Sequence, residues 1–276
     1  MNSVIIIGNG FDLAHGLKTK YSDFILWYFN QILGSLNRGR TPHYNDKLLT
    51  LQLNGGYKAQ VVIQSIEHLK EILGSGEYVI QFSSRQFIEK IIQNIVDFKW
   101  VDIEYEYYFQ LESLYKSIER GQSDRVGVLQ RLKSLNISFE FLKRKLIDYL
   151  TTIKTSEIKI PAIEQQLKKI AVKIHPNAGE NLLIINFNYT SLIHNYFSEI
   201  KTTNSKIIDI HGSIGNDKNP IIFGYGDEMD EYYTKIERLN ENAFLKNFKS
   251  FSYFYTNNYR SILSFISDET DYDVYI

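Results

Sequence analysis

The sequence has no cysteine among its 276 residues. This absence excludes disulfide bonds and cysteine-ligated zinc, and it agrees with a protein of a reducing compartment. An excess of one charge is missing as well, because 31 lysines and arginines stand against 32 aspartates and glutamates. A nucleic acid is therefore not indicated as the main partner.

Long apolar runs are also absent from the N-terminus. The first run, residues 4–7, is short and no basic segment precedes it, so we expect neither a signal peptide nor a membrane-spanning helix there. The expectation is a cytoplasmic protein without a membrane partner. Hydrophobic residues (43%) and aromatic residues (14%) are plentiful, enough for a sizeable core in one large domain or in a domain with a big insertion.

Short, mostly β-branched runs predict the strands of a parallel α/β sheet. Such composition is typical of strands that are buried on both faces. Polar residues and glycines follow the first four runs, and a fifth run begins at the end of the sequence. The carboxyl ends of parallel strands meet at one edge of a sheet, where ligands bind in open α/β folds. The predicted strands are residues 4–7, 182–185, 206–210, 220–224 and 271–276.

Between the first and second of these strands the apolar residues recur at helical spacing. Two examples are the series Phe87, Ile88, Ile91, Ile92, Ile95 and the series Phe139, Leu142, Leu146, Leu150, which predict helices with one apolar face. We therefore predict a core of residues 1–24 and 176–276 and a mainly helical insertion of residues 25–175. Such an insertion suits a lid, a sensor, or an interface with a second copy or an activating protein partner.

The loop after the first strand, "GNGFDLAHG" at residues 8–16, is a candidate phosphate-binding loop. The dinucleotide fingerprint G-x-G-x-x-G fails because Leu13 occupies its third glycine position. Backbone N–H groups at a helix start can still bind a phosphate. Two plain alternatives stay open, namely a tight strand-to-helix turn that uses the freedom of glycine and a helix cap formed by Asp12.

Four segments of the sequence resemble motifs of known families. Gly8, Gly10 and Gly16 fall at the three glycine positions of the first nucleotide-binding motif of sirtuins, G-A-G-I-S-x-x-x-G-I. The segment "NFNYT" resembles the sirtuin T-Q-N-I-D and aligns Asn188 with the catalytic asparagine. The segment "HGS" aligns His211 with the catalytic histidine, and "NPIIFGYGDE" resembles P-x-V-x-F-G-E.

A closer resemblance is to the AbiH-like bacteriophage abortive-infection family. That family has GNGFD-x-x-x-G-L near its start, W-x-D-x-E in a helical part, N-F-N-Y-T, and I-H-G-S followed by F-G-x-G. This sequence has "WVDIE" at residues 100–104, and the resemblance runs from Ile5 to about Phe251. It implies a Rossmann-like parallel sheet of sirtuin type with a large helical insertion, and a part in antiphage abortive infection.

The resemblance implies that NAD is the substrate and that the reaction is hydrolysis to ADP-ribose and nicotinamide, with no metal. Cleavage builds positive charge on the ribose, so catalysis depends on positioning and electrostatics. Asn188 would orient water or a ribose hydroxyl, and His211 would accept a proton. The other residues implied to bind the dinucleotide are Gly8, Asn9, Gly10, Phe11, Asp12, His15, Asn186, Thr190, Gly212, Ser213, Gly224 and Asp227.

The sequence also departs from these families. It lacks the four-cysteine zinc module of sirtuin deacylases, so we do not expect protein deacylation. Asp12 stands where sirtuins have serine, and Thr190 where they have aspartate. Both families continue past the last strand into a G-x-S segment that helps to bind the dinucleotide, whereas this sequence ends at Ile276.

Two other functions stay open at this point. One is a non-catalytic module that senses NAD or ADP-ribose. The other is a metal-dependent hydrolase or nuclease, since hard cations prefer oxygen ligands; its candidate ligands are Asp12, Glu104, His211 and Asp227. For several residues a plain structural role stays open as an alternative: a turn for Asn188 or His15, and an exposed helical carboxylate for Asp102 or Glu104.

Overall fold

The computed structural model describes residues 2–38, 43–54, 62–83, 85–98, 102–173, 181–200, 205–226, 230–267 and 271–276. The chain divides into two compact units. We call residues 1–19, 150–222 and 249–276 the sheet unit, and residues 20–149 and 223–248 the helical unit. The domain division predicted from the sequence, with boundaries after residues 24 and 175, stays a prediction.

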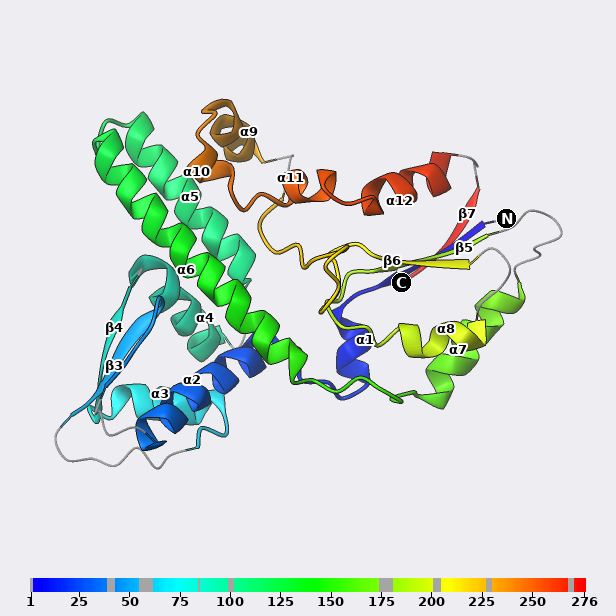
Figure 1. Ribbon diagram of the computed structural model, residues 1–276, viewed down its shortest axis with the longest axis horizontal. Helices are drawn as coiled ribbons and strands as arrows, with labels where there is room; N and C mark the ends of the chain where they lie inside the picture. Colours follow the sequence, from blue (N-terminus) through cyan, green and yellow to red (C-terminus); the bar gives the residue numbers. More distant parts are fainter. Residues whose placement is uncertain are drawn as a thin grey trace. The chain divides into compact units, whose positions relative to one another are not determined.

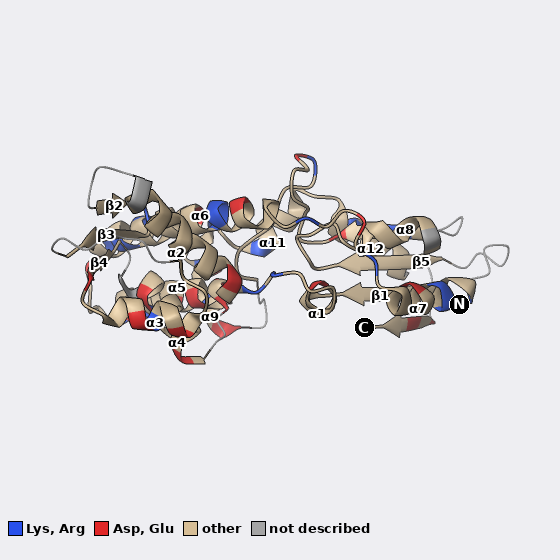
Figure 2. Ribbon diagram, turned by 90° about the horizontal axis from the view of Figure 1, so that it is seen from below, with Lys and Arg blue, Asp and Glu red and all other residues tan. Residues whose placement is uncertain are grey.

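The sheet unit contains a four-stranded parallel sheet with the strand order β6-β5-β1-β7. Its two central strands, β5 and β1, carry no charged residue and appear tan in Figure 2. These strands can therefore be covered on both faces, as the sequence predicts. The parallel α/β sheet is confirmed, whereas its sirtuin type stays a prediction. The strands are β1 (Asn2–Ile7), β5 (Leu182–Asn186), β6 (Ser205–Asp209) and β7 (Tyr272–Tyr275).

Helices cover both faces of this sheet (Figure 1). On one face, α7 (Pro161–Val172) and α8 (His194–Ile200) pack against Ile5 and Ile184. On the other face, α11 (Lys249–Phe254) and α12 (Asn258–Ser267) pack against Val4 and Leu183. Successive residues of a strand point to opposite faces, and for this reason neighbouring apolar residues serve two separate hydrophobic clusters.

The predicted strand at residues 220–224 is wrong. The backbone N–H of Ile222 donates to the carbonyl oxygen of His211 (2.8 Å), and that of Ser213 donates to Asn219 (3.0 Å), so the segment closes a turn. Ile222 and Phe223 are nevertheless buried. An apolar run predicts that its residues are buried, but burial alone does not distinguish a strand from a packed loop.

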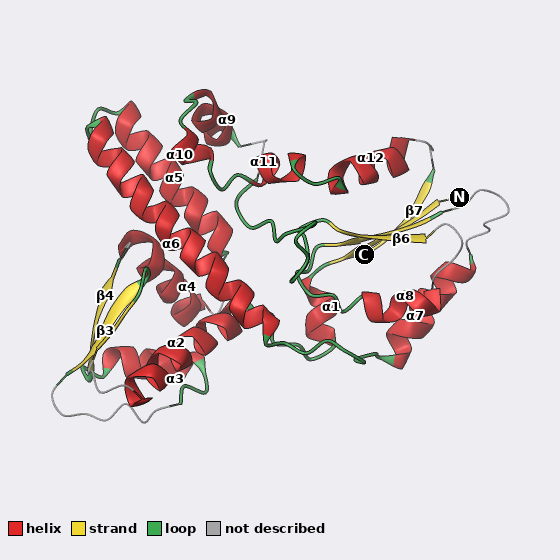
Figure 3. Ribbon diagram, in the orientation of Figure 1, coloured by secondary structure: helices red, strands yellow, loops and turns green. Residues whose placement is uncertain are grey.

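The helical unit consists mainly of helices, and it also contains an antiparallel sheet that the sequence analysis missed (Figure 3). The three strands are β2 (His43–Asn45), β3 (Leu49–Leu53) and β4 (Tyr78–Phe82), and they pair in the order β2-β3-β4. They are only three to five residues long, although β3 (LTLQL) alternates apolar and polar residues as a half-buried strand does. A mainly helical insertion is therefore an incomplete description.

The remaining helices have the following bounds. In the helical unit they are α2 (Tyr21–Arg38), α3 (Ile66–Gly74), the π-helical turn η1 (Arg85–Glu89), α4 (Lys90–Phe98), α5 (Ile103–Glu119), α9 (Glu231–Arg238) and α10 (Asn242–Leu245). Helix α6 (Arg125–Thr151) begins in the helical unit, and its last two residues belong to the sheet unit, as does α1 (Asn9–Ala14). Within the described part of the chain, no helix has the length and apolarity needed to cross a bilayer.

Candidate functional site

Three neighbouring strands bring the predicted residues to one edge of the sheet. Gly8 follows β1, Asn188 lies two residues after β5, and His211 lies two residues after β6. Because β6, β5 and β1 are adjacent and parallel, the three segments meet at the carboxyl edge. The chain places β5 and β6 on one side of β1 and β7 on the other, and ligands of doubly wound sheets bind where the strand order reverses in this way.

The centre of this edge is a buried carboxylate, Asp12, which is 1% exposed. The hydroxyl of Thr190 donates to both of its oxygens, at 2.8 and 3.0 Å, and Asn188 Nδ2 donates to Oδ1 at 3.0 Å. Burial raises the pKa of Asp12, and these two donors oppose the rise. The carboxylate therefore ties the loop after β5 to the first turn after β1.

Asp12 is not the helix cap that the sequence left open. Gly8 occupies the N-cap position of α1, and no side chain caps this helix. Gly8, Asn9 and Gly10 are exposed, and a Cβ atom on either glycine would meet no atom within 4 Å. Packing within the described chain therefore does not require glycine at these two positions. Their small size leaves the backbone open to close approach by a ligand.

Asn188 is held in one orientation. Its Nδ2 donates to the carbonyl oxygen of Gly8 (3.0 Å) as well as to Asp12, which occupies both amide hydrogens. Asn188 is 7% exposed. Since the two acceptors assign the nitrogen, Oδ1 lies on the other side of the amide, where it accepts from no residue that the structure describes.

Asn186 supports the loop after β5 through hydrogen bonds. Its Nδ2 donates to the backbone oxygens of Asn188 and Thr190 and, at 2.8 Å, to Asp209. Its Oδ1 accepts from the N–H of Asn188 (3.1 Å). Asn186 is 1% exposed, so its contacts position "NFNYT", and its predicted contact with the dinucleotide stays a prediction.

His15 is likewise engaged within the fold. Its Nδ1–H donates to the carbonyl oxygen of Phe11 (2.7 Å), and its Nε2 lies 2.5 Å from the hydroxyl of Tyr196. That hydroxyl accepts from the N–H of Ile160 (2.6 Å) and can therefore donate to Nε2. The rings of His15 and Phe11 also contact each other at a tilt of 45°, with centroids 4.5 Å apart. Both residues anchor α1 on α8, which is a structural role.

His211 is enclosed by aromatic rings. Its ring centroid lies 5.2 Å from that of Phe187, 6.0 Å from Tyr189 and 6.2 Å from Tyr253. Burial and the positive charge of Lys249 lower the pKa of His211 to about 4, although a hydrogen bond with the backbone of Phe187 opposes this. His211 is therefore neutral at pH 7, with one ring nitrogen able to accept a proton.

The two residues after His211 shape the turn. Gly212 has φ +78°, and a Cβ there would lie 2.1 Å from the carbonyl oxygen of Pro220. The N–H of Ser213 donates to Asn219 (3.0 Å), and Ser213 is 8% exposed. Both residues hold the turn closed, which keeps His211 at the end of β6.

A cavity of about 200 Å³ borders the loop after β5. Thr190 and Ser191 form one wall, Ile214 another, and Thr151 and Thr155 add further polar groups. The cavity therefore lies beside the Thr190–Asp12 pair, where it could admit a small, partly polar group.

The comparison with protein families decides the membership of the chain. The model of the family described as "Bacteriophage abortive infection AbiH" matches residues 4–275. This chain belongs to the AbiH family. The searches of curated proteins and of solved structures found no match to it. Membership indicates a function in abortive infection by bacteriophage, as the motifs of the sequence predict.

In this AbiH family member, the other predicted residues belong to the helical unit or lie outside the described residues. Gly224 belongs to the helical unit, where its N–H donates to Glu104 Oε1 (2.7 Å) and a Cβ would lie 2.0 Å from the carbonyl oxygen of Asn247. Asp102 caps α5 by accepting from the N–H of Tyr105 (2.9 Å). Asp227 lies outside the described residues. Gly224, Asp102 and Glu104 thus have structural partners of their own.

A metal site finds no support in the described ranges of the chain. Within them, no three histidine, aspartate or glutamate residues gather in a way that could hold an ion. Asp12 and His211 belong to the sheet unit and Glu104 to the helical unit. The carboxylate of Asp12 is already engaged by two donors from the chain itself.

Sequence reasoning missed the pairing of His194 with Asp209, next to the AbiH "NFNYT" loop. His194 Nε2 lies 3.1 Å from Asp209 Oδ2, and this hydrogen bond raises the pKa of His194. Asp209 also accepts from Asn186. The available signal was the strand register, since Asn186 and Asp209 pair as the last residues of β5 and β6. A polar residue that ends an apolar strand is a candidate for such a network.

Proposed function

We propose that this AbiH family member hydrolyses the nicotinamide glycosidic bond of NAD, releasing nicotinamide and ADP-ribose. The observation that carries the proposal is the convergence of Gly8–Gly10, Asn188 and His211 at the carboxyl edge of three adjacent parallel strands. Depletion of NAD in an infected cell would link this chemistry to abortive infection.

The exposed start of α1 would receive the pyrophosphate. The first N–H groups of a helix have no partner within it and carry a partial positive charge. Gly8 and Gly10 have no side chain to hinder an approaching phosphate. Asn9 is exposed beside them and accepts from the hydroxyl of Thr19 (2.6 Å).

Asn188 would orient the attacking water or a ribose hydroxyl through Oδ1. The two hydrogen bonds of Nδ2 to Gly8 and Asp12 fix the amide before substrate arrives. Such preorganised groups stabilise developing charge without reorganisation during the reaction. Asp12 then acts through Asn188 as a positioning residue. In this proposal Asp12, which is 1% exposed, acts on the dinucleotide through Asn188 and not by direct contact.

His211 would accept the proton that leaves the water or hydroxyl. A base must be unprotonated at the working pH, and the lowered pKa of about 4 keeps His211 neutral. The aromatic rings near it offer less polar surroundings than water, in which electrostatic interactions are stronger. No metal is needed for this scheme.

Nicotinamide release from NAD by the purified chain tests the proposal. We expect Asn188→Ala and His211→Ala to lower the rate by about 100-fold or more, since a positioned acid or base contributes that much. His43→Gln, which alters an exposed histidine of β2, serves as the matched control and should keep the wild-type rate. Variants of Asn188 and His211 that release nicotinamide at the wild-type rate would show that the site is wrong.

The pH dependence of the rate gives a second test of His211. Its pKa is lowered, so the neutral, active form persists as pH falls and is lost only as pH passes through about 4. The rate should therefore stay level from pH 8 to about 5. Lys249→Gln removes the neighbouring positive charge and should move the acid limb to higher pH. An unchanged limb in Lys249→Gln would argue against His211 as the base.

A module that binds NAD or ADP-ribose without cleaving it is the second candidate. It is favoured by one observation: the loop that would bind phosphate is exposed, whereas Asn188 is 7% exposed. Calorimetry separates the two functions. Saturable NAD binding without any nicotinamide release would favour the sensor over the hydrolase.

A further inference from the structure

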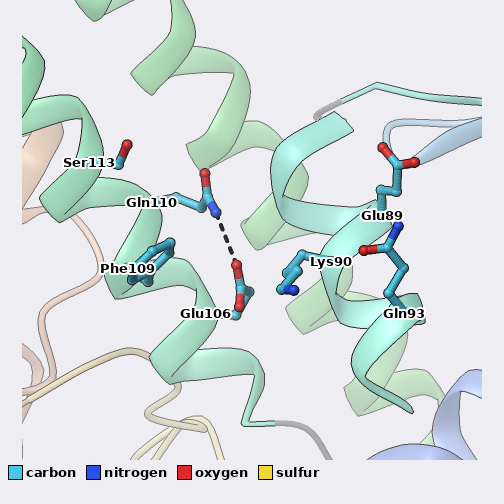
Figure 4. Close-up of a pocket in the computed structure, with 7 residues that line it drawn as sticks. All are labelled: Glu89, Lys90, Gln93, Glu106, Phe109, Gln110 and Ser113. Carbon is cyan, nitrogen blue, oxygen red and sulfur yellow. Dashed lines mark hydrogen bonds between the residues drawn. The ribbon is translucent and has the colours of Figure 1, made fainter. Parts of the chain in front are cut away.

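The helical unit contains a cavity of about 380 Å³ that the proposed NAD chemistry does not use. It lies between α5 and the segment formed by η1 and the start of α4 (Figure 4). Cavities of about 300–1,000 Å³ hold small molecules. The lining residues are Glu89, Lys90, Gln93, Glu106, Phe109, Gln110 and Ser113.

Helical spacing gathers the α5 residues on one face. Glu106, Gln110 and Ser113 follow one another at intervals of four and three residues, and Phe109 stands beside them. Gln110 Nε2 donates to Glu106 Oε1 at 2.9 Å, which is the dashed line in Figure 4. This contact fixes the carboxylate at the wall of the cavity.

Glu106 has fewer donors than a buried carboxylate requires. It is 6% exposed, and an ionised carboxylate accepts about four hydrogen bonds. Among the described residues only Gln110 donates one to it. Burial raises the pKa of Glu106, with Gln110 and the charge of Lys90 opposing the rise. Since buried charges in proteins are normally paired, the cavity provides an acceptor that a ligand could satisfy.

The other lining residues indicate which kind of ligand group would donate hydrogen bonds to Glu106. Glu89 and Glu106 against Lys90 give the cavity a formal charge of −1 (two negative charges, one positive), which favours a cation. Phe109 is 48% exposed, so part of its ring is open to stacking. A guanidinium group is planar, carries parallel N–H donors that match a carboxylate, and stacks on aromatic faces. An ammonium group carries the same positive charge, but it is not planar and cannot stack on a ring in this way.

We propose that this cavity binds a guanidinium group, with Glu106 as its acceptor and Phe109 as its stacking surface. The group would come from a free small molecule or from an arginine side chain of a partner protein. The proposal does not depend on NAD hydrolysis, because every lining residue belongs to the helical unit.

Calorimetric titration of the full chain with ethylguanidinium and ethylammonium, which differ only in the head group, tests the proposal. We expect saturable binding of ethylguanidinium and binding of ethylammonium that is at least about tenfold weaker, because the bidentate contact and the stacking are lost. Equal affinities, or no saturable binding of ethylguanidinium, would overturn the proposal. This comparison needs no variant and therefore no test of folding.

Variants then identify the residues. Glu106→Gln keeps an oxygen for Gln110 and removes the charge, so we expect it to lower the affinity for ethylguanidinium about tenfold or more. Phe109→Leu should weaken binding by a smaller factor. Glu112→Gln is the matched control, because Glu112 lies on the same helix and pairs with Lys116 outside the cavity (2.5 Å). Wild-type affinity in Glu106→Gln would contradict the assignment.

Two further probes, free arginine and a peptide with an internal arginine, separate the sources of the group. If free arginine binds more tightly than the peptide, the ligand is a small molecule. If the peptide binds more tightly than free arginine, the ligand is a protein partner; either result supports a guanidinium site. Guanosine presents N–H donors on a nucleobase instead. If guanosine displaces ethylguanidinium at a lower concentration than arginine does, the proposal would be overturned in favour of a nucleobase site.

Discussion

At the scale of single residues, the carboxyl edge of the sheet is held together by buried polar side chains. Asp12, Asn186 and Thr190 are each at most 4% exposed, and each makes hydrogen bonds to a neighbouring segment. An unsatisfied buried group costs more than a hydrogen bond returns. The arrangement of this edge therefore depends on each of these partners being present.

The hydroxyl of Thr190 should be necessary for this arrangement. Thr190→Val leaves buried Asp12 with one donor side chain fewer, and we expect a loss of about 1–3 kcal/mol in the free energy of unfolding at pH 7. Thr190→Ser keeps a hydroxyl and should lose less. Urea unfolding of both variants measures the difference.

The same pair has a predictable pH dependence. The pKa of Asp12 in the folded protein is raised above its ordinary value of 3.8, so its burial favours folding at low pH and this contribution is lost as pH rises through the folded value. Losing the hydroxyl raises that pKa further. The effect of Thr190→Val should therefore be large at pH 7 and small near pH 4, and a constant effect would contradict the role of the Asp12 carboxylate.

At the scale of elements, β1 and β5 could be predicted from the sequence because their burial on both faces leaves a local composition signal. Strands β6 and β7 were predicted from short apolar runs, although they are only partly buried. The run at residues 220–224 carries the same signal in a packed turn. Strands β2, β3 and β4 were missed, although β3 alternates apolar and polar residues, because each is short and forms only by pairing with another segment. Pairing partners are not encoded in the composition of a single short segment.

The turn after β6 should depend on Gly212. Gly212→Ala should be strained for two reasons: the backbone has φ +78°, and a Cβ would lie 2.1 Å from the carbonyl oxygen of Pro220. The left-handed backbone alone costs about 1–2 kcal/mol, and the steric conflict adds to it. Urea unfolding should show a loss larger than that strain alone.

Gly215 offers a matched control in the same loop. It has φ +75°, and a Cβ there would meet nothing within 4 Å. Gly215→Ala should therefore show only the backbone strain of about 1–2 kcal/mol. Equal losses in Gly212→Ala and Gly215→Ala would show that the turn relaxes away from Pro220.

At the scale of the whole molecule, the chain forms two units that are both discontinuous in sequence. Each contains its own fully buried side chains, such as Leu183 in the sheet unit and Leu111 in the helical unit. Since a unit with its own core can open by itself, damage to one core should be felt first in that unit.

Hydrogen exchange can check this separation. Leu183→Ala creates a cavity beneath β5 and should cost about 2–5 kcal/mol. We expect faster exchange in β1, β5 and β6 and unchanged exchange in α5. Leu111→Ala, at the same exposure of 0%, should give the converse pattern. Faster exchange in both units in response to either variant would show that the chain opens as one cooperative body.

The sequence by itself determined the parallel strands, the order of the motifs and the membership in the AbiH family, because each depends on residues that are close together in the chain. Only the tertiary structure decided the order β6-β5-β1-β7, the bond between Asp12 and Thr190 across 178 residues, and the grouping of residues 223–248 with the helices. It also placed Glu106 in a cavity. Such outcomes follow from packing and from the satisfaction of buried polar groups, which are properties of the whole chain and leave no local pattern.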